Sequence, residues 1–79
     1  INLSNQYAGN AYGIPEDYHI DTIKFLAKHE GIFLDPVYTS KAFTGLIMDI
    51  QNNVIKKGEK VLYIHTGGIP GIFAYPQYF

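Results

Sequence analysis

Two short apolar runs, each closed by residues that interrupt a strand, constrain the fold of this chain most. The first run, 32–34, is closed by Asp35-Pro36, and the second, 61–64, is followed by the glycines at 67–68. Proline cannot donate a hydrogen bond to a β-ladder, and a continuous apolar run is typical of a strand covered on both faces of a parallel sheet. The sequence therefore predicts two buried strands.

Helical patterns flank both runs. Pro15 can open a helix that Gly31 ends as its C-cap, and acidic residues lie early and lysines late, as the helix dipole favours. A second helix is predicted over 41–54, with Thr39 or Ser40 as its N-cap. Its apolar positions recur at helical spacing: Phe43, Leu46, Ile47, Ile50 and Val54. A last short helix follows from Pro70 to Ala74.

The predicted order is α-β-α-β-α, which is a partial three-layer αβα unit with parallel strands. Both strands of such a unit end at one edge of the sheet, where ligands bind in open α/β folds. The polar clusters 38–40 and 65–68 follow the two strands. The periodicity thus predicts an edge and candidate residues, but no reaction.

Composition limits what the chain can do alone. It has 79 residues, 47% of them hydrophobic, and no cysteine, so we expect much of its apolar surface to pack on a partner or on the rest of a larger protein. A net charge of -1 gives no reason to expect nucleic acid or a membrane as a partner. The absence of cysteine fits a reducing, cytoplasmic location. The three histidines lack the spacing of metal ligands, so no metal is expected.

Three segments resemble one enzyme family. Residues 7–15 (YAGNAYGIP), 30–42 (EGIFLDPVYTSKA) and 65–75 (HTGGIPGIFAY) are similar, in the same order, to segments of the D-cysteine desulfhydrase and 1-aminocyclopropane-1-carboxylate (ACC) deaminase family. The resemblance implies an enzyme of pyridoxal-phosphate (PLP) fold type II, the tryptophan synthase β type. Residues 1–79 would then be the C-terminal part of its large PLP-binding domain, with the N-terminal remainder absent.

The same resemblance implies roles for individual residues. Tyr38 and Tyr12 match tyrosines beside the substrate and are the candidate catalytic residues. Thr66 matches the residue near the pyridine nitrogen of the cofactor, and Thr39 and Gly67 complete the candidate cofactor-binding set. No lysine of this chain lies in the family's Schiff-base motif, so we expect the chain alone to be inactive.

Substrate choice rests on two positions. Deaminase members resemble Val-Tyr-Glu and His-Leu-Gly-Gly where this chain has Thr39 and Thr66, so the resemblance favours D-cysteine desulfhydrase. Ser40, Phe43 and Gly71 depart from the family pattern and leave substrate preference open. ACC deaminase, a non-catalytic interaction module and a split enzyme remain alternatives. The expected partners are a small amino-acid substrate and the remainder of the parent chain or a homodimer mate.

Overall fold

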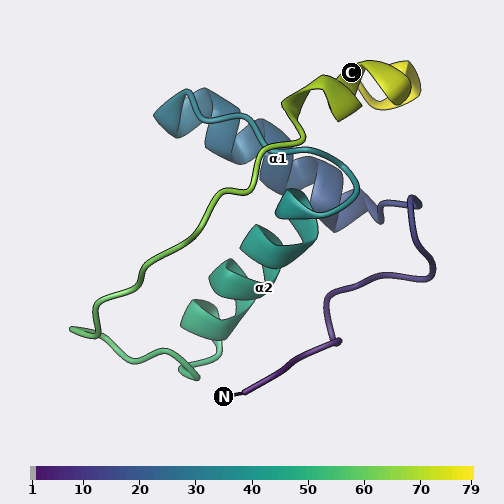
Figure 1. Cartoon of the computed structure of the whole chain (residues 1–79). Helices are drawn as coiled ribbons and strands as arrows, with labels where there is room; N and C mark the ends of the chain where they lie inside the picture. The colour runs from purple at the N-terminus through teal and green to yellow at the C-terminus, as the bar shows by residue number, and fades with distance from the viewer. Residues whose placement is uncertain (1) are drawn as a thin grey trace.

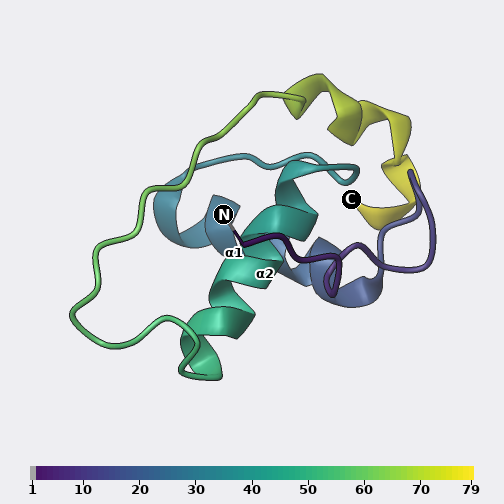
Figure 2. The same ribbon diagram turned by 60° about the horizontal axis from the view of Figure 1, so that its bottom comes forward.

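The computed structural model describes residues 2–79, which form two α-helices followed by two 3-10 helices. The helices are α1 (Asp17–Glu30), α2 (Thr39–Gln51), η1 (Ile69–Ala74) and η2 (Pro76–Tyr78). Figure 1 shows α1 and α2 crossing, with the segment after α2 returning as a long loop to η1 near α1. Turned by 60°, Figure 2 shows the N-terminal loop, residues 2–15, passing across α2 before it reaches the start of α1.

The limits of α1 follow from its caps. Glu16 is the N-cap, and its backbone N–H donates to Nδ1 of His19 in a reciprocal capping arrangement. Gly31 has φ 65°, and its N–H donates to the carbonyl of Ala27, which confirms the predicted glycine C-cap. Pro15 lies before the N-cap rather than at the first helical position.

α2 begins earlier than the periodicity predicted and ends at Gln51. Tyr38 is its N-cap residue and makes no side-chain capping bond, so the prediction of Thr39 or Ser40 as the cap was wrong. The carboxylate of Asp35 instead accepts hydrogen bonds from backbone N–H groups at the start of the helix. The first backbone N–H groups of a helix have no carbonyl partner within the helix, and here the Asp35 carboxylate accepts their hydrogen bonds.

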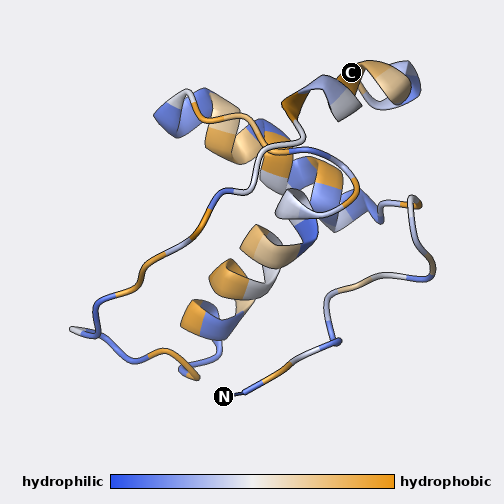
Figure 3. Ribbon diagram, viewed as in Figure 1, coloured by the Kyte–Doolittle hydropathy of each residue, from blue (hydrophilic) through white to orange (hydrophobic). Residues whose placement is uncertain are grey.

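The core lies where α1 meets the segment before α2. Ile20, Ile23 and Leu26 of α1 are buried with Leu34, and three aromatic side chains pack against them: Phe43, Tyr63 and Tyr78. Figure 3 shows the apolar positions of both helices, with short apolar stretches in the connecting loops. Two buried hydroxyls join the helices, since Thr44 Oγ1 donates to Thr22 Oγ1 at 2.7 Å.

The predicted parallel strands are absent from residues 2–79, so the α/β assignment with an α-β-α-β-α order was wrong. The runs 32–34 and 61–64 are irregular, and the contact beside them is made by a side chain: Nε2 of His65 donates to the carbonyl of Phe33 at 2.7 Å. A run of three or four residues gains few ladder bonds, and two strands alone bury too little surface to hold a sheet. Accordingly Leu62 and Ile64 remain 87% and 73% exposed.

Candidate functional site

The structure brings Tyr12 and Tyr38 together, although 26 positions separate them in the sequence. Tyr12 lies in the N-terminal loop and Tyr38 at the start of α2. The Tyr38 hydroxyl donates to the Tyr12 hydroxyl at 3.2 Å, and the rings meet edge to face with centroids 5.8 Å apart. Both side chains are exposed, so the paired hydroxyls are accessible to a ligand.

The hydrogen bond with Tyr12 raises the pKa of Tyr38, and partial burial, Tyr12 and Asp35 raise it further. A phenol whose pKa lies above its usual value of about 10 keeps its proton at neutral pH. Tyr38 therefore presents a hydrogen-bond donor, not a phenolate, to whatever lies beside it.

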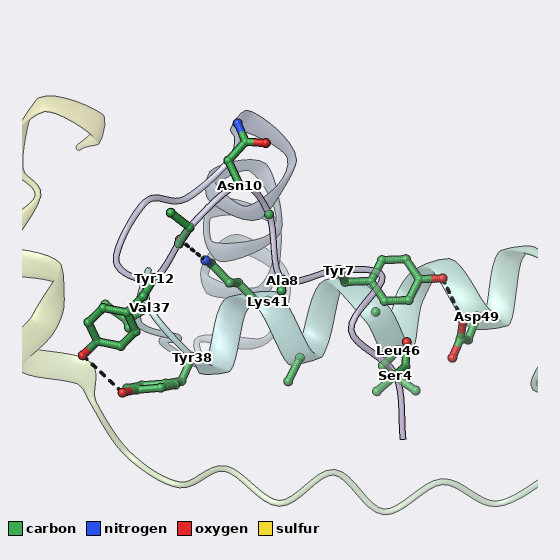
Figure 4. Close-up of a pocket in the computed structure, with 14 residues that line it drawn as sticks. Ser4, Tyr7, Ala8, Asn10, Tyr12, Val37, Tyr38, Lys41, Leu46 and Asp49 are labelled. Carbon is green, nitrogen blue, oxygen red and sulfur yellow. Dashed lines mark hydrogen bonds between the residues drawn. The ribbon is translucent and has the colours of Figure 1, made fainter. Parts of the chain in front are cut away.

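A cavity of about 650 Å³ lies between the N-terminal loop and α2, with the two tyrosines at one end. Figure 4 shows Lys41 in its middle, donating from Nζ to the carbonyl of Ala11 at 3.1 Å, and Tyr7 at the far end. The volume falls within the range of small-molecule sites. The lining is mostly apolar with a few polar groups, which suits a small amino acid or a flat ring.

Contacts along its length hold the N-terminal loop against α2. The Tyr7 hydroxyl donates to Asp49 Oδ1 at 2.9 Å, and the Tyr7 ring lies on Gly45, where a Cβ would come within 2.7 Å of Cδ2. With the bond from Lys41 to the residue before Tyr12, these contacts fix the loop at both ends of the cavity.

His19 ties the same loop to α1. Its ring is fully buried, with Nε2 donating to the carbonyl of Tyr7 at 2.7 Å and Nδ1 accepting from the N–H of Glu16 at 2.9 Å. An accepting Nδ1 requires the neutral ring. Burial lowers the pKa of His19, and Lys41 lowers it too, against the opposing influence of the Tyr7 carbonyl and Glu16.

Asp35 organises the turn before α2. Its side chain is 3% exposed and accepts four hydrogen bonds, from the N–H groups of Val37, Tyr38 and Thr39 and from the Thr39 hydroxyl. Burial acts to raise the pKa of Asp35, but these hydrogen bonds outweigh it and hold the pKa below its usual value. The carboxylate is therefore ionised in the folded chain.

The other three candidate residues lie in two environments. Thr39 is buried, and its hydroxyl donates to Asp35 Oδ1 at 2.6 Å and accepts from the Asp35 N–H at 2.7 Å, so it serves the turn. Thr66 is exposed, and Gly67 follows with φ 99°. His65 orders this stretch, since its Nδ1 accepts from the Gly67 N–H at 3.0 Å.

The exposed Thr66 hydroxyl and the open backbone at Gly67 fit a flat, hydrogen-bonding cofactor ring, because nothing lies within 4 Å of where a Cβ of Gly67 would be. Thr39 fits such a ring less directly, since its hydroxyl already makes two short bonds within the turn. Within residues 2–79 no three acidic or histidine side chains gather as metal ligands.

The sequence reasoning missed the residues that hold the site together: Asp35, His19, Lys41 and Tyr7. Asp35 offered a signal, because Asp before Pro at the start of a helical stripe is typical of a turn whose carboxylate accepts backbone N–H groups. The other three act across long sequence separations on backbone carbonyls or on a distant side chain, which residue type and spacing do not reveal.

No protein-family model matches the chain. Over all 79 residues it is 47% identical to the C-terminal part of a protein of Schizosaccharomyces pombe described as a probable 1-aminocyclopropane-1-carboxylate deaminase. The chain spans 23% of the length of that relative. The resemblance drawn from the three segments is thereby confirmed. No helix in the described part of the chain is long and apolar enough to cross a membrane.

Proposed function

We propose that this chain, which is 47% identical to the C-terminal part of a probable ACC deaminase, forms one wall of a PLP-dependent active site. The observation that carries the proposal is the pair of accessible hydroxyls of Tyr12 and Tyr38 at the end of the cavity. These two residues face the substrate. PLP, when bound, supplies an electron sink that allows bonds at the α-carbon of an amino acid to break.

The role of each residue follows from its environment. Tyr38 keeps its proton and donates it to the Tyr12 hydroxyl until an acceptor atom of the substrate takes the place of Tyr12. Thr66 and Gly67 face the cofactor, the first with a neutral hydroxyl and the second with open backbone. Thr39 supports this arrangement from within the turn. The lysine that binds PLP lies outside this chain.

The reaction we propose is the conversion of D-cysteine and water to pyruvate, ammonia and hydrogen sulfide. Its support is the small hydroxyl side chain at positions 39 and 66, where deaminase members resemble glutamate and leucine. Thr39 is buried and its hydroxyl donates to Asp35 Oδ1, a bond that glutamate at this position would lose. Deamination of ACC is the second candidate, because the relative is described as a probable enzyme of that kind.

We also propose that the remainder of a longer chain, or a second subunit, covers the apolar side chains this segment exposes. Leu62, Ile64 and Phe73 are each more than 70% exposed, which is unusual for a group of large apolar residues. We propose a cytoplasmic location as well, with which the lack of cysteine in these 79 residues agrees.

A substitution at Tyr38 tests the proposal. In the protein that carries this segment, Tyr38→Phe should lower kcat for D-cysteine by about 10²-fold, because a positioned hydroxyl that donates or moves a proton contributes about that much. KM should change far less. Tyr18→Phe is the control, since Tyr18 is also exposed but lies on α1 away from the cavity lining. Equal kcat values for the two variants would reject the assignment of Tyr38.

A further inference from the structure

The segment 30–42, which carries Tyr38, and the segment 65–75, which carries Thr66, contact each other at Asp35 and Gly68. The backbone at Gly68 passes so close to Asp35 that an alanine Cβ there would lie 2.8 Å from Oδ1 and 2.9 Å from Cγ. Real Cβ atoms do not approach other atoms so closely, so the segment that carries Thr66 can take this position only with glycine at 68.

Asp35 is also the residue that fixes the backbone of Tyr38. Oδ2 accepts from the N–H groups of Val37 and Tyr38, each at 2.8 Å, and Oδ1 accepts from the Thr39 N–H at 3.0 Å. The buried carboxylate of Asp35 thus accepts hydrogen bonds from three successive backbone N–H groups, those of residues 37–39. The same carboxylate lies against the backbone of Gly68. Bonds to an ionised acceptor are shorter and stronger than neutral ones.

A second contact joins the same two segments. The Tyr63 hydroxyl donates to the carbonyl of Thr39 at 2.9 Å, so the chain before Thr66 is tied to the first residue of α2. Two contacts therefore place the segment 63–68 against the start of α2: the hydrogen bond of Tyr63 and the close approach of Gly68 to Asp35.

We propose that Asp35 is a positioning residue: its carboxylate places Tyr38 against Tyr12 and, through its contact with Gly68, sets the separation between Tyr38 and Thr66. The part that concerns catalysis rests on the proposed function, whereas the part that concerns the placement of Tyr38 does not. Asp35 does not touch the substrate or the cofactor in this account.

A matched pair of glycines isolates the contact. Gly68 and Gly58 have nearly equal φ angles of 89° and 91°, but a Cβ on Gly58 would meet nothing within 4 Å. Alanine is therefore strained alike at both positions, and only Gly68→Ala also collides with Asp35. We expect Gly68→Ala to raise the unfolding equilibrium constant of the chain roughly tenfold more than Gly58→Ala does. Equal effects in urea unfolding would overturn the proposed contact.

Asp35→Asn tests the placement of Tyr38. The amide keeps the size of the side chain but turns one acceptor oxygen into a donor that faces backbone N–H groups. Tyr38 should then move away from Tyr12, so that the nuclear Overhauser effect between the two rings is lost, and its pKa should fall toward the ordinary value of about 10, in part because the Asp35 charge is gone. The phenol pKa can be followed by NMR with tyrosine labelled at Cζ, and Tyr38→Phe assigns the signal. A folded Asp35→Asn protein with an unchanged Tyr38 pKa would overturn the proposal.

Turnover separates this proposal from the proposed function. In the protein that carries this segment, Gly68→Ala and Asp35→Asn should each lower kcat for D-cysteine at least tenfold, and Gly58→Ala should leave it unchanged. If the unsubstituted protein turned over neither D-cysteine nor ACC while Asp35→Asn still separated the rings of Tyr12 and Tyr38, the positioning role would stand and the proposed reaction would fail.

Discussion

Ser40 carries a hydroxyl that the packing of α2 leaves without a partner. Its side chain is completely buried, and Oγ makes no hydrogen bond within the described residues. A buried polar group without a partner destabilises the fold, because it loses its hydrogen bonds to water and gains none in return. The backbone at Ser40 is satisfied, since its N–H donates to the carbonyl of Asp35 at 3.1 Å.

Ser40→Ala should therefore stabilise the chain by about 1 kcal/mol, since it removes the unpaired hydroxyl and little else. Ser4→Ala is the control, because Ser4 is exposed and its removal should change the free energy of unfolding by less than about 0.5 kcal/mol. Urea unfolding measures both values. A loss of stability in Ser40→Ala would show that the hydroxyl has a partner in solution.

Single residues of the candidate site differ in how far the sequence revealed them. Tyr12 and Tyr38 were singled out by the resemblance, and the structure pairs their hydroxyls. Thr39 was assigned to the cofactor, yet its hydroxyl lies within the Asp35 turn. A motif identifies a residue but does not show which partner its side chain bonds to. Here the Thr39 hydroxyl bonds to Asp35, four residues earlier.

At the scale of elements, the N-terminal loop is the part whose position most affects the cavity. It has no regular secondary structure, so side-chain contacts hold it in place: Tyr7 on α2, Lys41 from α2 and His19 from α1. Of the residue types that make these contacts, histidine is the one whose unperturbed pKa lies between pH 5 and pH 8. The groups that face its ring are Tyr7, Tyr18, Glu16 and Lys41.

Acid should therefore loosen this loop. Burial lowers the pKa of His19 in the folded chain, so the unfolded chain, with a histidine pKa of about 6.5, takes up a proton first as the pH falls. The stability that the neutral ring contributes is fully present above that pH and declines below it. The hydrogen bonds to Asp35 also lower its pKa, although burial acts to raise it. The stability that the ionised carboxylate contributes is lost only below about pH 4.

His19→Gln should flatten the fall in the free energy of unfolding between about pH 7 and pH 5, because glutamine does not titrate there. His29→Gln on the exposed side of α1 is the matched control and should leave the slope as it is. Urea unfolding at the two pH values gives the slope. If His19→Gln kept the full pH dependence, His19 would not be the group responsible.

The helices could be read from the sequence, whereas the connecting segments could not. Spacing of apolar residues and Gly31 located α1 closely, because both signals are local. The run 61–64 was interpreted as a strand because it is continuously apolar, but a strand needs a ladder partner, and within residues 2–79 none is offered. The meeting of the 38–40 and 65–68 segments, expected at a sheet edge, is instead brought about by Gly68 against Asp35 and by Tyr63 bonded to Thr39.

At the scale of the whole molecule, the chain matches one part of a longer relative. It spans 23% of the length of its relative and leaves large apolar side chains such as Leu62 and Phe73 exposed. In the function we propose, it offers hydroxyls to a substrate and to a cofactor ring, and the lysine that binds PLP lies outside its six lysines. We therefore propose that catalysis belongs to the protein that carries this segment and not to the segment alone.

The most direct measurement is ammonia release from D-cysteine and from ACC by the protein that carries this segment and by the 79-residue chain alone, both supplied with PLP. We predict a higher kcat/KM for D-cysteine than for ACC in the former, with sulfide released along with ammonia, and no product from the chain alone. Absence of turnover of both substrates by the longer protein with bound PLP would contradict the proposed function. Turnover by the 79-residue chain alone would contradict the claim that it forms only one wall of the site.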